Sequence, residues 1–369
     1  EDGVKVLSNV VASSAAMHEK YGGIVPEVAS REQLRCIIPV LTESIESGSG
    51  LKKGQTPLAV IKRHIDAIAV AVGPGLIGSL LVGVETAKTI ALVTEKPIIP
   101  VNHVIAHMYA NFVNPSIIPS EGEGSLAHAS SNELRDSSAT PQNDKKITFP
   151  AISLVVSGGH TELYLMKSIK DLAWLGGTLD DAAGEAFDKT ARLLGFESRG
   201  GVAIQEAAKK CQMINPPAGE AGAKCQIKLP RPMIGDESLN FSFSGLKTAV
   251  MRQWKKCEDH SEKLTNAFAH EIQESITDVL VEKTLRTAKK YRVKSILLSG
   301  GVAANTRLRE KFKASLIAYH LSPDRLFIPP VNLCTDNAVY IASYAFFRGH
   351  PADWHEVTAC PDLNIEVQA

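Results

Sequence analysis

Two histidines, His103 and His107, stand four residues apart in the stretch Val101-Asn102-His103-Val104-Ile105-Ala106-His107. The stretch is expected to open a helix, with Asn102 as its N-cap. Side chains at i and i+4 of a helix project from one face, so both imidazoles are close enough to bind one metal ion. Alone, the pair predicts a metal site only weakly, because two histidines also reach this spacing by chance.

A third ligand is suggested by Asp336, in the stretch Cys334-Thr335-Asp336-Asn337, at the start of another expected helix. Two histidines and one carboxylate leave coordination positions open, as a catalytic or substrate-holding metal requires. This ligand set is compatible with Fe2+ or Zn2+. The alternative is an ordinary carboxylate in the first turn of a helix, where it complements the helix dipole.

Two glycine turns could hold an anionic or nucleotide ligand. Ser157-Gly158-Gly159-His160-Thr161 joins two expected strands, and its successive N–H groups can form an anion nest, although an ordinary hairpin has the same pattern. Ser299-Gly300-Gly301 lies between a strand and a helix, which favours a phosphate or a nucleoside hydroxyl. Asn305 could donate to a base or ribose, or be a solvated helix residue. Two such loops, assigned to two lobes, favour a nucleotide clamped in a cleft.

Acidic residues crowd one expected helix over residues 180–194. Asp181, Glu185 and Asp188 follow at i, i+4 and i+7 and so share a face, next to Asp180. The alternative is a solvated acidic face. Small apolar residues around them favour a face near a ligand, and Asp188 could accept hydrogen bonds from ribose hydroxyls.

Composition limits the classes of function. The chain has 369 residues with 44% hydrophobic content, and its 40 Lys and Arg balance 40 Asp and Glu, so RNA binding needs a local basic patch. Its six cysteines form no C-x-x-C pair, which favours a reducing compartment and argues against a disulfide framework. Basic clusters on three expected helices are interpreted as solvated faces: Arg252, Lys255 and Lys256; Arg286, Lys289, Lys290 and Arg292; Arg307, Arg309, Lys311 and Lys313.

The elements that must position these residues alternate between strand and helix, which indicates βαβ units. We expect strands over 4–12, 65–72, 97–101, 151–156, 161–166, 294–298 and 325–328, and helices over 27–47, 79–94, 103–107, 180–194, 200–210 and 264–291. The uncharged run 67–84 is broken by Gly73-Pro74-Gly75 and is interpreted as buried α/β core, not a membrane span. We predict a first lobe of residues 1–114 and 337–369, a polar insertion over 115–147, and a second lobe over 148–336.

Together, these stretches resemble the TsaD family, the tRNA N(6)-adenosine threonylcarbamoyltransferases, also known under the older names Gcp and O-sialoglycoprotein endopeptidase. The matching stretches occur in the family's order. They are Tyr21-Gly22-Gly23-Ile24-Val25-Pro26-Glu27-Val28-Ala29-Ser30-Arg31, Gly73-Pro74-Gly75-Leu76, Asn102-His103 to His107, Ser157 to Thr161, Asp180 to Lys189, Phe243-Ser244-Gly245-Leu246-Lys247, Ser299-Gly300-Gly301-Val302 with Asn305, and Cys334 to Asn337.

The resemblance implies an α/β, two-lobed, actin-like and Hsp70-like (ASKHA) fold with mixed sheets and a ligand cleft between the lobes. It implies that His103, His107 and Asp336 hold one divalent metal, Fe2+ rather than Zn2+. It implies an acyltransferase that moves a threonylcarbamoyl group from threonylcarbamoyl-AMP to the exocyclic amine of adenosine 37 in ANN-decoding tRNA, forming threonylcarbamoyladenosine. The implied partners are tRNA and TsaB-like and TsaE-like proteins. The implied substrate-binding residues are Val155, Val156, Ser157, Gly158, Gly159, Asp188, Gly201 and Asn305; no catalytic residue is assigned.

Alternatives remain at this point. The chain starts after the family's first strand and its Ser-Cys-Asp-rich loop, so an inactive or non-catalytic subunit of the same fold is one alternative, and Gln205 stands where the family often has Asp. A metalloprotease would need H-E-x-x-H, but Val104 replaces the glutamate. A sugar or acetate kinase of the same superfamily would lack the histidine pair. No targeting segment is recognised, which favours a bacterial cytoplasmic enzyme without membrane attachment.

Overall fold

The computed structural model describes residues 4–13, 17, 25–49, 56–113, 146–197, 199–214, 227–258 and 260–366. The predicted polar insertion lies almost wholly outside these residues. The chain divides into two compact units, Glu1–Ile147 with Asp336–Val367, and Thr148–Thr335 with Gln368–Ala369. Asp336, which we assigned to the second lobe, therefore belongs to the first unit.

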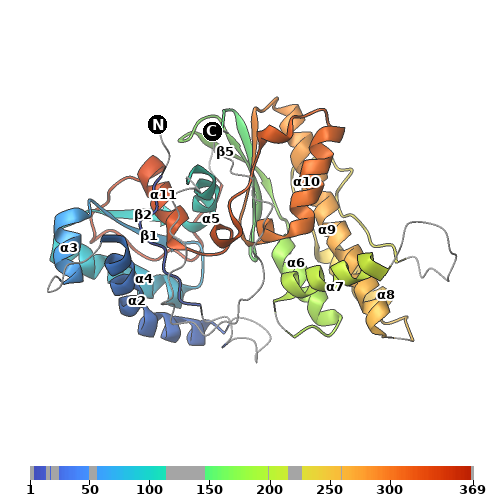
Figure 1. Cartoon of the computed structure of the whole chain (residues 1–369), viewed down its shortest axis with the longest axis horizontal. Helices are drawn as coiled ribbons and strands as arrows, with labels where there is room; N and C mark the ends of the chain where they lie inside the picture. The colour runs from blue at the N-terminus through green and yellow to red at the C-terminus, as the bar shows by residue number, and fades with distance from the viewer. Residues whose placement is uncertain are drawn as a thin grey trace. The chain divides into compact units, whose positions relative to one another are not determined.

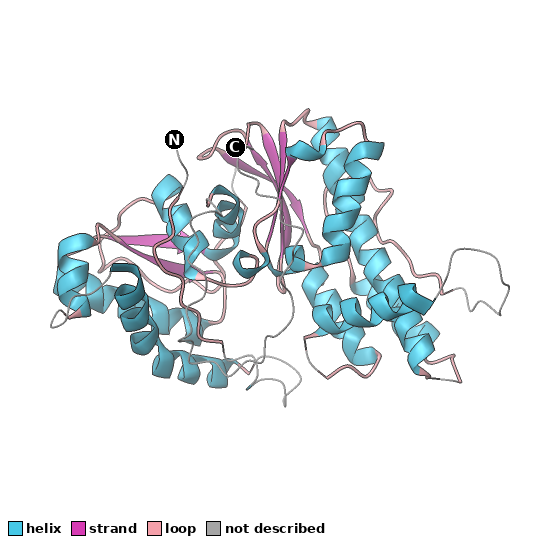
Figure 2. Cartoon of the chain, viewed as in Figure 1, coloured by secondary structure: helices cyan, strands magenta, loops and turns pink. Residues whose placement is uncertain are grey.

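The first unit is built on a two-stranded parallel sheet of β1 (Ile68–Gly73) and β2 (Ile98–Asn102). Helix α4 (Ile77–Thr94) connects them and packs against β1, which confirms the predicted βαβ unit (Figures 1 and 2). Helix α2 (Pro26–Ser49) was also predicted and packs against α4. Helix α3 (Pro57–His64) was not predicted, although Thr56 caps it and proline stands at its first position.

Among the described helices, only α4 is long and apolar enough to cross a membrane by length and composition. Core helices of α/β proteins meet the same test. Its contacts with β1 and α2 support the interpretation of this stretch as part of the core of the first unit.

Two short helical segments and the bend before a longer helix carry the candidate metal ligands. Helix α5 (His103–Ala106) is a single turn, and a 3-10 helix, η1 (His107–Phe112), continues it. Helix α11 (Ala338–Arg348), which follows Asp336, packs against α5, η1 and both strands. The strand predicted over residues 4–12 is wrong: only Val4 bridges, to Val113, because the rest of that stretch has no strand beside it among the described residues.

The second unit contains a mixed five-stranded sheet in the order β5-β4-β3-β6-β7. Its strands are β3 (Ala151–Val156), β4 (Thr161–Met166), β5 (Leu172–Gly177), β6 (Ser295–Ser299) and β7 (Leu326–Phe327). β3 and β4 form the predicted antiparallel hairpin, whereas β6 runs parallel to β3. β5 was missed because it ends in two glycines, which disfavour strands. Gly177 leaves room for the carboxylate of the buried Glu162, since a Cβ would lie 1.9 Å from its Oε2.

Helices cover this sheet, and α9 (Glu262–Lys290) is central among them (Figure 1). It packs against β3, α6 (Ala183–Leu193), α7 (Gly200–Ile214) and α10 (Thr306–Ala318), and residues along most of its length are buried. Helix α8 (Ser244–Trp254) packs against α6. The remaining short segments are η3 (Gly301–Ala304), η4 (Pro323–Arg325) and η5 (Val331–Leu333).

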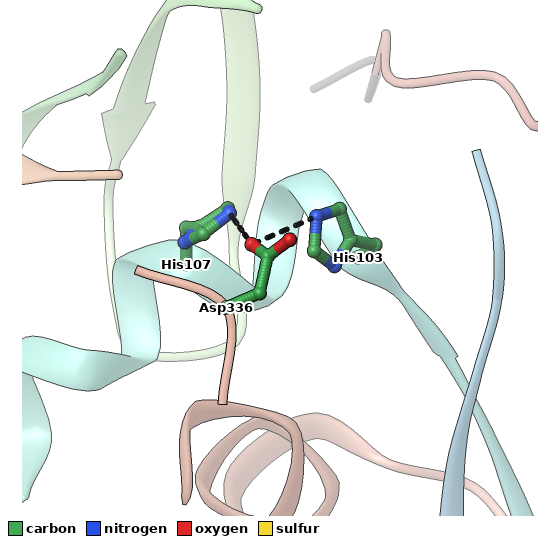
Figure 3. Close-up of side chains that lie close together, drawn as sticks. All are labelled: His103, His107 and Asp336. Carbon is green, nitrogen blue, oxygen red and sulfur yellow. Dashed lines mark ion pairs between the residues drawn. The ribbon is translucent and has the colours of Figure 1, made fainter. Parts of the chain in front are cut away.

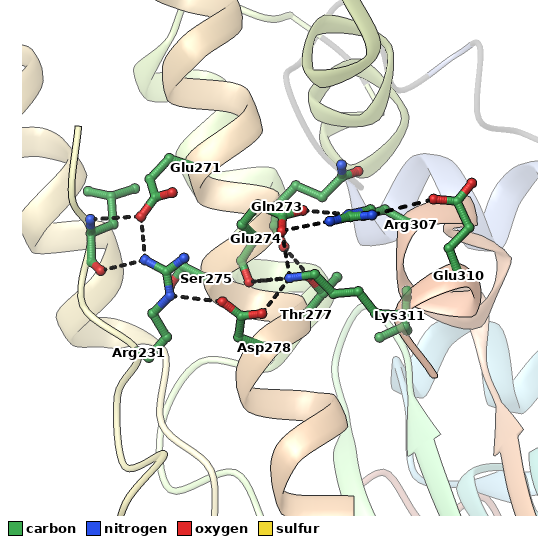
Figure 4. A network of polar contacts seen from close by, with 12 residues as sticks. Arg231, Glu271, Gln273, Glu274, Ser275, Thr277, Asp278, Arg307, Glu310 and Lys311 are labelled. Carbon is green, nitrogen blue, oxygen red and sulfur yellow. Dashed lines mark hydrogen bonds and ion pairs between the residues drawn. The ribbon is translucent and has the colours of Figure 1, made fainter. Parts of the chain in front are cut away.

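A network of ion pairs joins α9 to α10 and to the segment before α8 (Figure 4). Glu274 accepts two hydrogen bonds from the Arg307 guanidinium, at 2.7 and 3.0 Å, and lies 2.8 Å from Lys311 Nζ. Lys311 also binds Asp278, which in turn binds Arg231. The interpretation of this third basic cluster as a solvated face was therefore wrong for Arg307 and Lys311, whose charges are paired inside the unit.

Burial opposes ionisation of Glu274, but the hydrogen bonds and charges of Arg307 and Lys311 outweigh it and lower its pKa to about 2. Because the folded-state pKa lies below the ordinary value of 4.5, the unfolded chain binds more protons between these two pH values. The stabilisation is complete above about pH 4.5 and is lost as pH falls toward 2.

We predict that Glu274→Gln lowers the free energy of unfolding at pH 7 by about 3 kcal/mol, because the variant loses the interactions that lower the pKa of Glu274 from 4.5 to about 2. Urea unfolding from pH 7 down to pH 3 measures this, and the variant should lose less stability in acid than the parent. Glu310→Gln is the matched control, since Glu310 lies 3.7 Å from the same arginine but its side chain is 67% exposed. Equal effects of the two substitutions would contradict the prediction.

Candidate functional site

The structure brings His103, His107 and Asp336 together within the first unit (Figure 3). One ligand atom from each residue lies within 4.8 Å of the others. Oδ1 of Asp336 is 3.6 Å from Nε2 of His103 and 3.7 Å from Nε2 of His107. The two imidazole rings meet edge to face, with their centroids 4.9 Å apart.

Two asparagines, each next to one of these side chains in the sequence, fix the starts of α5 and α11. Asn102 Oδ1 accepts hydrogen bonds from the N–H groups of Val104 and Ile105, as predicted for an N-cap, and its Nδ2 donates to Asn364 O. Asn337 Oδ1 likewise accepts from the N–H groups of the first turn of α11. The side chains of His103 and Asp336 therefore start from backbone whose direction is set by local hydrogen bonds.

The donor set fits a divalent metal. A tetrahedral ion with ligand bonds of about 2.1 Å separates its ligand atoms by about 3.4 Å, close to the histidine–aspartate separations of 3.6 and 3.7 Å. The side chain of His107 is 2% exposed, whereas that of Asp336 is 81% exposed. The three residues would therefore hold an ion from its buried side and leave coordination positions open on the other.

One residue at this site was missed by the sequence analysis. The Tyr340 hydroxyl donates to Oδ1 of Asp336 at 3.2 Å and lies 3.4 Å from Nδ1 of His103. Burial and the neighbouring Asp336 carboxylate raise the pKa of Tyr340 far above its ordinary value, so the hydroxyl keeps its proton. No local pattern marks Tyr340, because Asp336 lies before the start of α11 at Ala338 and the two residues share no helix face in the sequence.

The two glycine loops lie side by side in the second unit, at the ends of neighbouring strands. β3 runs into Ser157-Gly158-Gly159 and β6 ends at Ser299, which is paired in register with Val155. The assignment of the loops to two lobes was wrong and also disagreed with the predicted bounds of the second lobe, 148–336: parallel pairing of β3 with β6 brings both loops to one edge of one sheet. Gly300 has φ +90, and a Cβ there would lie 2.4 Å from Val156 O.

The first loop combines a closed turn with an exposed tip. Ser157 N–H donates to His160 O at 2.8 Å, and Ser157 Oγ accepts from His160 N–H. Val155 and Val156 are buried strand residues, so only their backbone could contact a ligand. Gly158 and Gly159 are exposed, with no other heavy atom within 4 Å of the position a Cβ would take among the described residues. Their position is compatible with the predicted contact between loop backbone and ligand.

Asp188 and Gly201 contact each other. Asp188, on α6, accepts hydrogen bonds from the N–H groups of Gly200 and Gly201 at the start of α7, and its pKa is raised chiefly by burial. The predicted acidic face is divided, because Asp181 precedes α6 and pairs with Lys189, which also binds Glu185. Of the three acidic residues predicted to share a face, only Asp188 accepts hydrogen bonds from the start of α7.

Asn305 is neither solvated nor pointed away from the protein. Its Oδ1 accepts from Leu308 N–H and caps α10, and its Nδ2 donates to Gln273 Oε1 at 3.1 Å. Gln205 Oε1 accepts from the N–H and hydroxyl of Thr306, in the same helix start. These residues form a polar cluster close to the Ser299-Gly300-Gly301 loop, in which Asn305 and Gln273 are buried and Gln205 and Thr306 are partly buried.

Asp180 organises a further loop that the sequence analysis named without assigning it a role. Its carboxylate accepts hydrogen bonds from the hydroxyls of Ser242 and Ser244 and from the N–H groups of Phe243 and Ser244. Burial opposes ionisation, but these hydrogen bonds lower the pKa of Asp180 below its ordinary value. The carboxylate thus fixes the start of α8.

Comparison with known proteins decides the family. A family model described as TsaD, tRNA N6-adenosine threonylcarbamoyltransferase, matches residues 5–123 and 125–343. The chain belongs to this family. Among TsaD relatives, the protein named tRNA N6-adenosine threonylcarbamoyltransferase of Persephonella marina is 41% identical over 93% of this chain and 83% of its own length. Relatives with the same name from Thermomicrobium roseum and Listeria welshimeri are 42% and 39% identical, over 95% and 99% of this chain and 89% and 92% of their own lengths.

Membership in the TsaD family agrees with the two α/β units and mixed sheets, and confirms the predicted fold class. The alternatives gain no support from these relatives. Val104, at the position a metalloprotease would need for glutamate, is fully buried in the core. Among the described residues, Cys36, Cys211, Cys257, Cys334 and Cys360 are free thiols.

We predict that His103→Ala or His107→Ala abolishes binding of one divalent ion per chain, because either change leaves only one imidazole and one carboxylate. Metal analysis after reconstitution with Zn2+ measures the stoichiometry. His355→Ala is the control, because His355 pairs with Asp353 at 2.7 Å on the surface, apart from the histidine pair. Unchanged metal content in the double variant His103→Ala/His107→Ala would contradict the assignment.

We also predict that Gly300→Ala lowers the free energy of unfolding by about 1–3 kcal/mol, because alanine is strained at positive φ and its Cβ would overlap Val156 O. The midpoint of urea unfolding measures the change. Gly301→Ala should have a much smaller effect, since no other described heavy atom lies within 4 Å of its Cβ position. A Gly300→Ala variant as stable as Gly301→Ala would contradict this account of the loop.

Proposed function

We propose that this chain is the acyltransferase that moves a threonylcarbamoyl group from threonylcarbamoyl-AMP to N6 of adenosine 37 in ANN-decoding tRNA, in threonylcarbamoyladenosine biosynthesis. Identity of about 40% over nearly the whole chain to relatives of that name carries the proposal. The His103, His107 and Asp336 cluster supports it, because it fits a divalent metal.

In this reaction the adenosine amine attacks the carbamoyl carbon, a C–N bond forms, the bond to AMP oxygen breaks, and the amine loses a proton. The poor nucleophile makes stabilisation of developing negative charge important. Backbone N–H groups of the Ser157-Gly158-Gly159 loop and the start of η3 can donate to phosphate or carbonyl oxygens. A bound metal would supply Lewis-acid polarisation of a carbonyl or phosphate oxygen.

The residues that we propose for the adenylate substrate are Val155, Val156, Ser157, Gly158, Gly159, Asp188, Gly201 and Asn305. In this proposal the loop residues contact it through backbone groups, since both valines are buried. Asp188 would accept from ribose hydroxyls with the carboxylate lone pairs that Gly200 and Gly201 leave available. Asn305 would contact the adenylate from the polar cluster that it forms with Gln273.

We favour Fe2+ over Zn2+ as the resident metal. Two histidines and one carboxylate with open coordination positions are typical of non-haem Fe(II) sites. We further propose a cytoplasmic enzyme that works with TsaB-like and TsaE-like partner proteins. The chain is neutral overall, so tRNA would have to bind locally to exposed basic residues, among them Arg252, Lys255, Lys289, Lys290 and Arg292.

The proposal is tested by incubating the protein with threonylcarbamoyl-AMP, candidate partner proteins and an unmodified ANN-decoding tRNA. We expect threonylcarbamoyladenosine in the digested tRNA, detected by mass spectrometry. The matched control is the same tRNA with guanosine at position 37, which lacks the accepting amine at that position of the ring. Absence of the modified nucleoside with every partner combination would refute the proposal.

A further inference from the structure

Tyr340 contacts all three members of the candidate metal cluster. Its hydroxyl reaches Asp336 and His103, and its ring lies 4.4 Å from the His107 ring, centroid to centroid, at an interplanar angle of 35°. We propose that Tyr340 is a positioning residue of the metal site, which holds two ligands through its hydroxyl and the third through its ring. The inference rests on the metal site of the proposed function and adds a residue that the ligand set does not include.

The Tyr340 hydroxyl can accept a hydrogen bond from His103 while it donates one to Asp336. Nε2 of His103 faces the shared Asp336 oxygen, so Nε2 is the nitrogen available to a metal. A neutral imidazole that binds metal through Nε2 carries its proton on Nδ1. Nδ1–H would then donate to the Tyr340 oxygen at 3.4 Å, while the Tyr340 O–H donates to Asp336 Oδ1 at 3.2 Å. One phenol would fix both the tautomer of a histidine ligand and the orientation of the carboxylate ligand.

The ring acts on His107 by packing. Tyr340 and His107 are both almost fully buried, so the two rings limit each other's rotation inside the unit. The Tyr340 ring lies farther from His103, at 5.9 Å between centroids. Ring and hydroxyl therefore have separate tasks, which a change from tyrosine to phenylalanine can separate.

The position of Tyr340 is fixed independently of the cluster. Asn337 Oδ1 accepts from Tyr340 N–H at 3.3 Å, in the first turn of α11. Farther along, Ser343 Oγ donates to Tyr109 O in η1, which ties α11 to the segment that carries His107. The phenol is thus held by a helix that is itself attached to the histidine segment. A rigidly held outer partner of this kind pre-orients ligands before the ion arrives.

The test compares Tyr340→Phe with Tyr344→Phe, in the full chain, by titration with Co2+ followed by its d–d absorption. Tyr344 lies one turn farther on α11, where its ring contacts Tyr109, 5.2 Å between centroids. We expect Tyr340→Phe to bind Co2+ about 10–100-fold more weakly and Tyr344→Phe to bind as the parent does. At saturating Co2+ the Tyr340→Phe spectrum should match that of the parent, because all three ligands remain.

Three results would overturn the inference. Parental Co2+ affinity in Tyr340→Phe would show that the hydroxyl positions nothing. A changed d–d spectrum at saturation would make Tyr340 a direct ligand instead. If Tyr340→Phe and Tyr344→Phe both melt at a lower temperature without metal and both lose the same Co2+ affinity, the effect belongs to the stability of α11.

The same titration separates this inference from the proposed function. If His103→Ala and His107→Ala bind Co2+ like the parent, the metal site and the role of Tyr340 both fail, whatever the tRNA assay shows. If they lose Co2+ and Tyr340→Phe does not, only the role of Tyr340 fails. Threonylcarbamoyl transfer by Tyr340→Phe should recover when the metal concentration is raised, as expected of a residue that acts through the ligands.

Discussion

The candidate metal site depends on where two helices begin. A helix start leaves N–H groups without intrahelical partners, and a side chain that accepts from them fixes the first turn. Asn102 and Asn337 do this for α5 and α11, immediately before His103 and shortly before Tyr340. Since α5 is only one turn long, its own hydrogen bonds could not set its direction, and the asparagine determines which way His103 projects.

In the second unit, strand order positions the candidate ligand-binding loops. Parallel pairing of β3 with β6 brings two turns that are far apart in sequence to one edge of the sheet. Glycine at position 300 then lets the second turn approach the backbone of the first strand, and Gly184 lets the start of α6 approach Ser157 O in the same way. Close backbone contact, more than any single side chain, gives this edge its shape.

Local signals in the sequence predicted what depends on local physics. The histidine spacing, the Asn102 cap, the glycine hairpin and the apolar run that became β1 all depend on residues close in sequence, and the structure confirms each of them. The same kind of signal overstated the helix after His103, which changes to 3-10 geometry at His107. The pattern of alternating polar and apolar residues shows which face is buried, but not how long the element continues.

Features that depend on tertiary contacts could not be predicted. The charges of Arg307 and Lys311 looked like a solvated face because their partners, Glu274 and Asp278, lie on another helix. The alternative that Asn305 is a solvated helix residue was wrong, because Asn305 contacts Gln273, which is also on α9. Tyr340 had no visible function in the sequence. It lies on α11 near the C-terminus, and two of its three contacts, His103 and His107, come from a segment more than 200 residues earlier.

The exposure of the three ligands sets a route for metal exchange. Exposed side-chain area falls from 81% at Asp336 to 25% at His103 and 2% at His107. An ion arriving from solvent therefore meets the carboxylate first and the buried imidazole last, and a chelator must begin at the carboxylate. The ion would lose its water molecules stepwise, and the negative charge of Asp336 would attract it before the last of them is displaced. The metal content of a preparation should consequently reflect its contact with chelators as much as the intrinsic strength of the site.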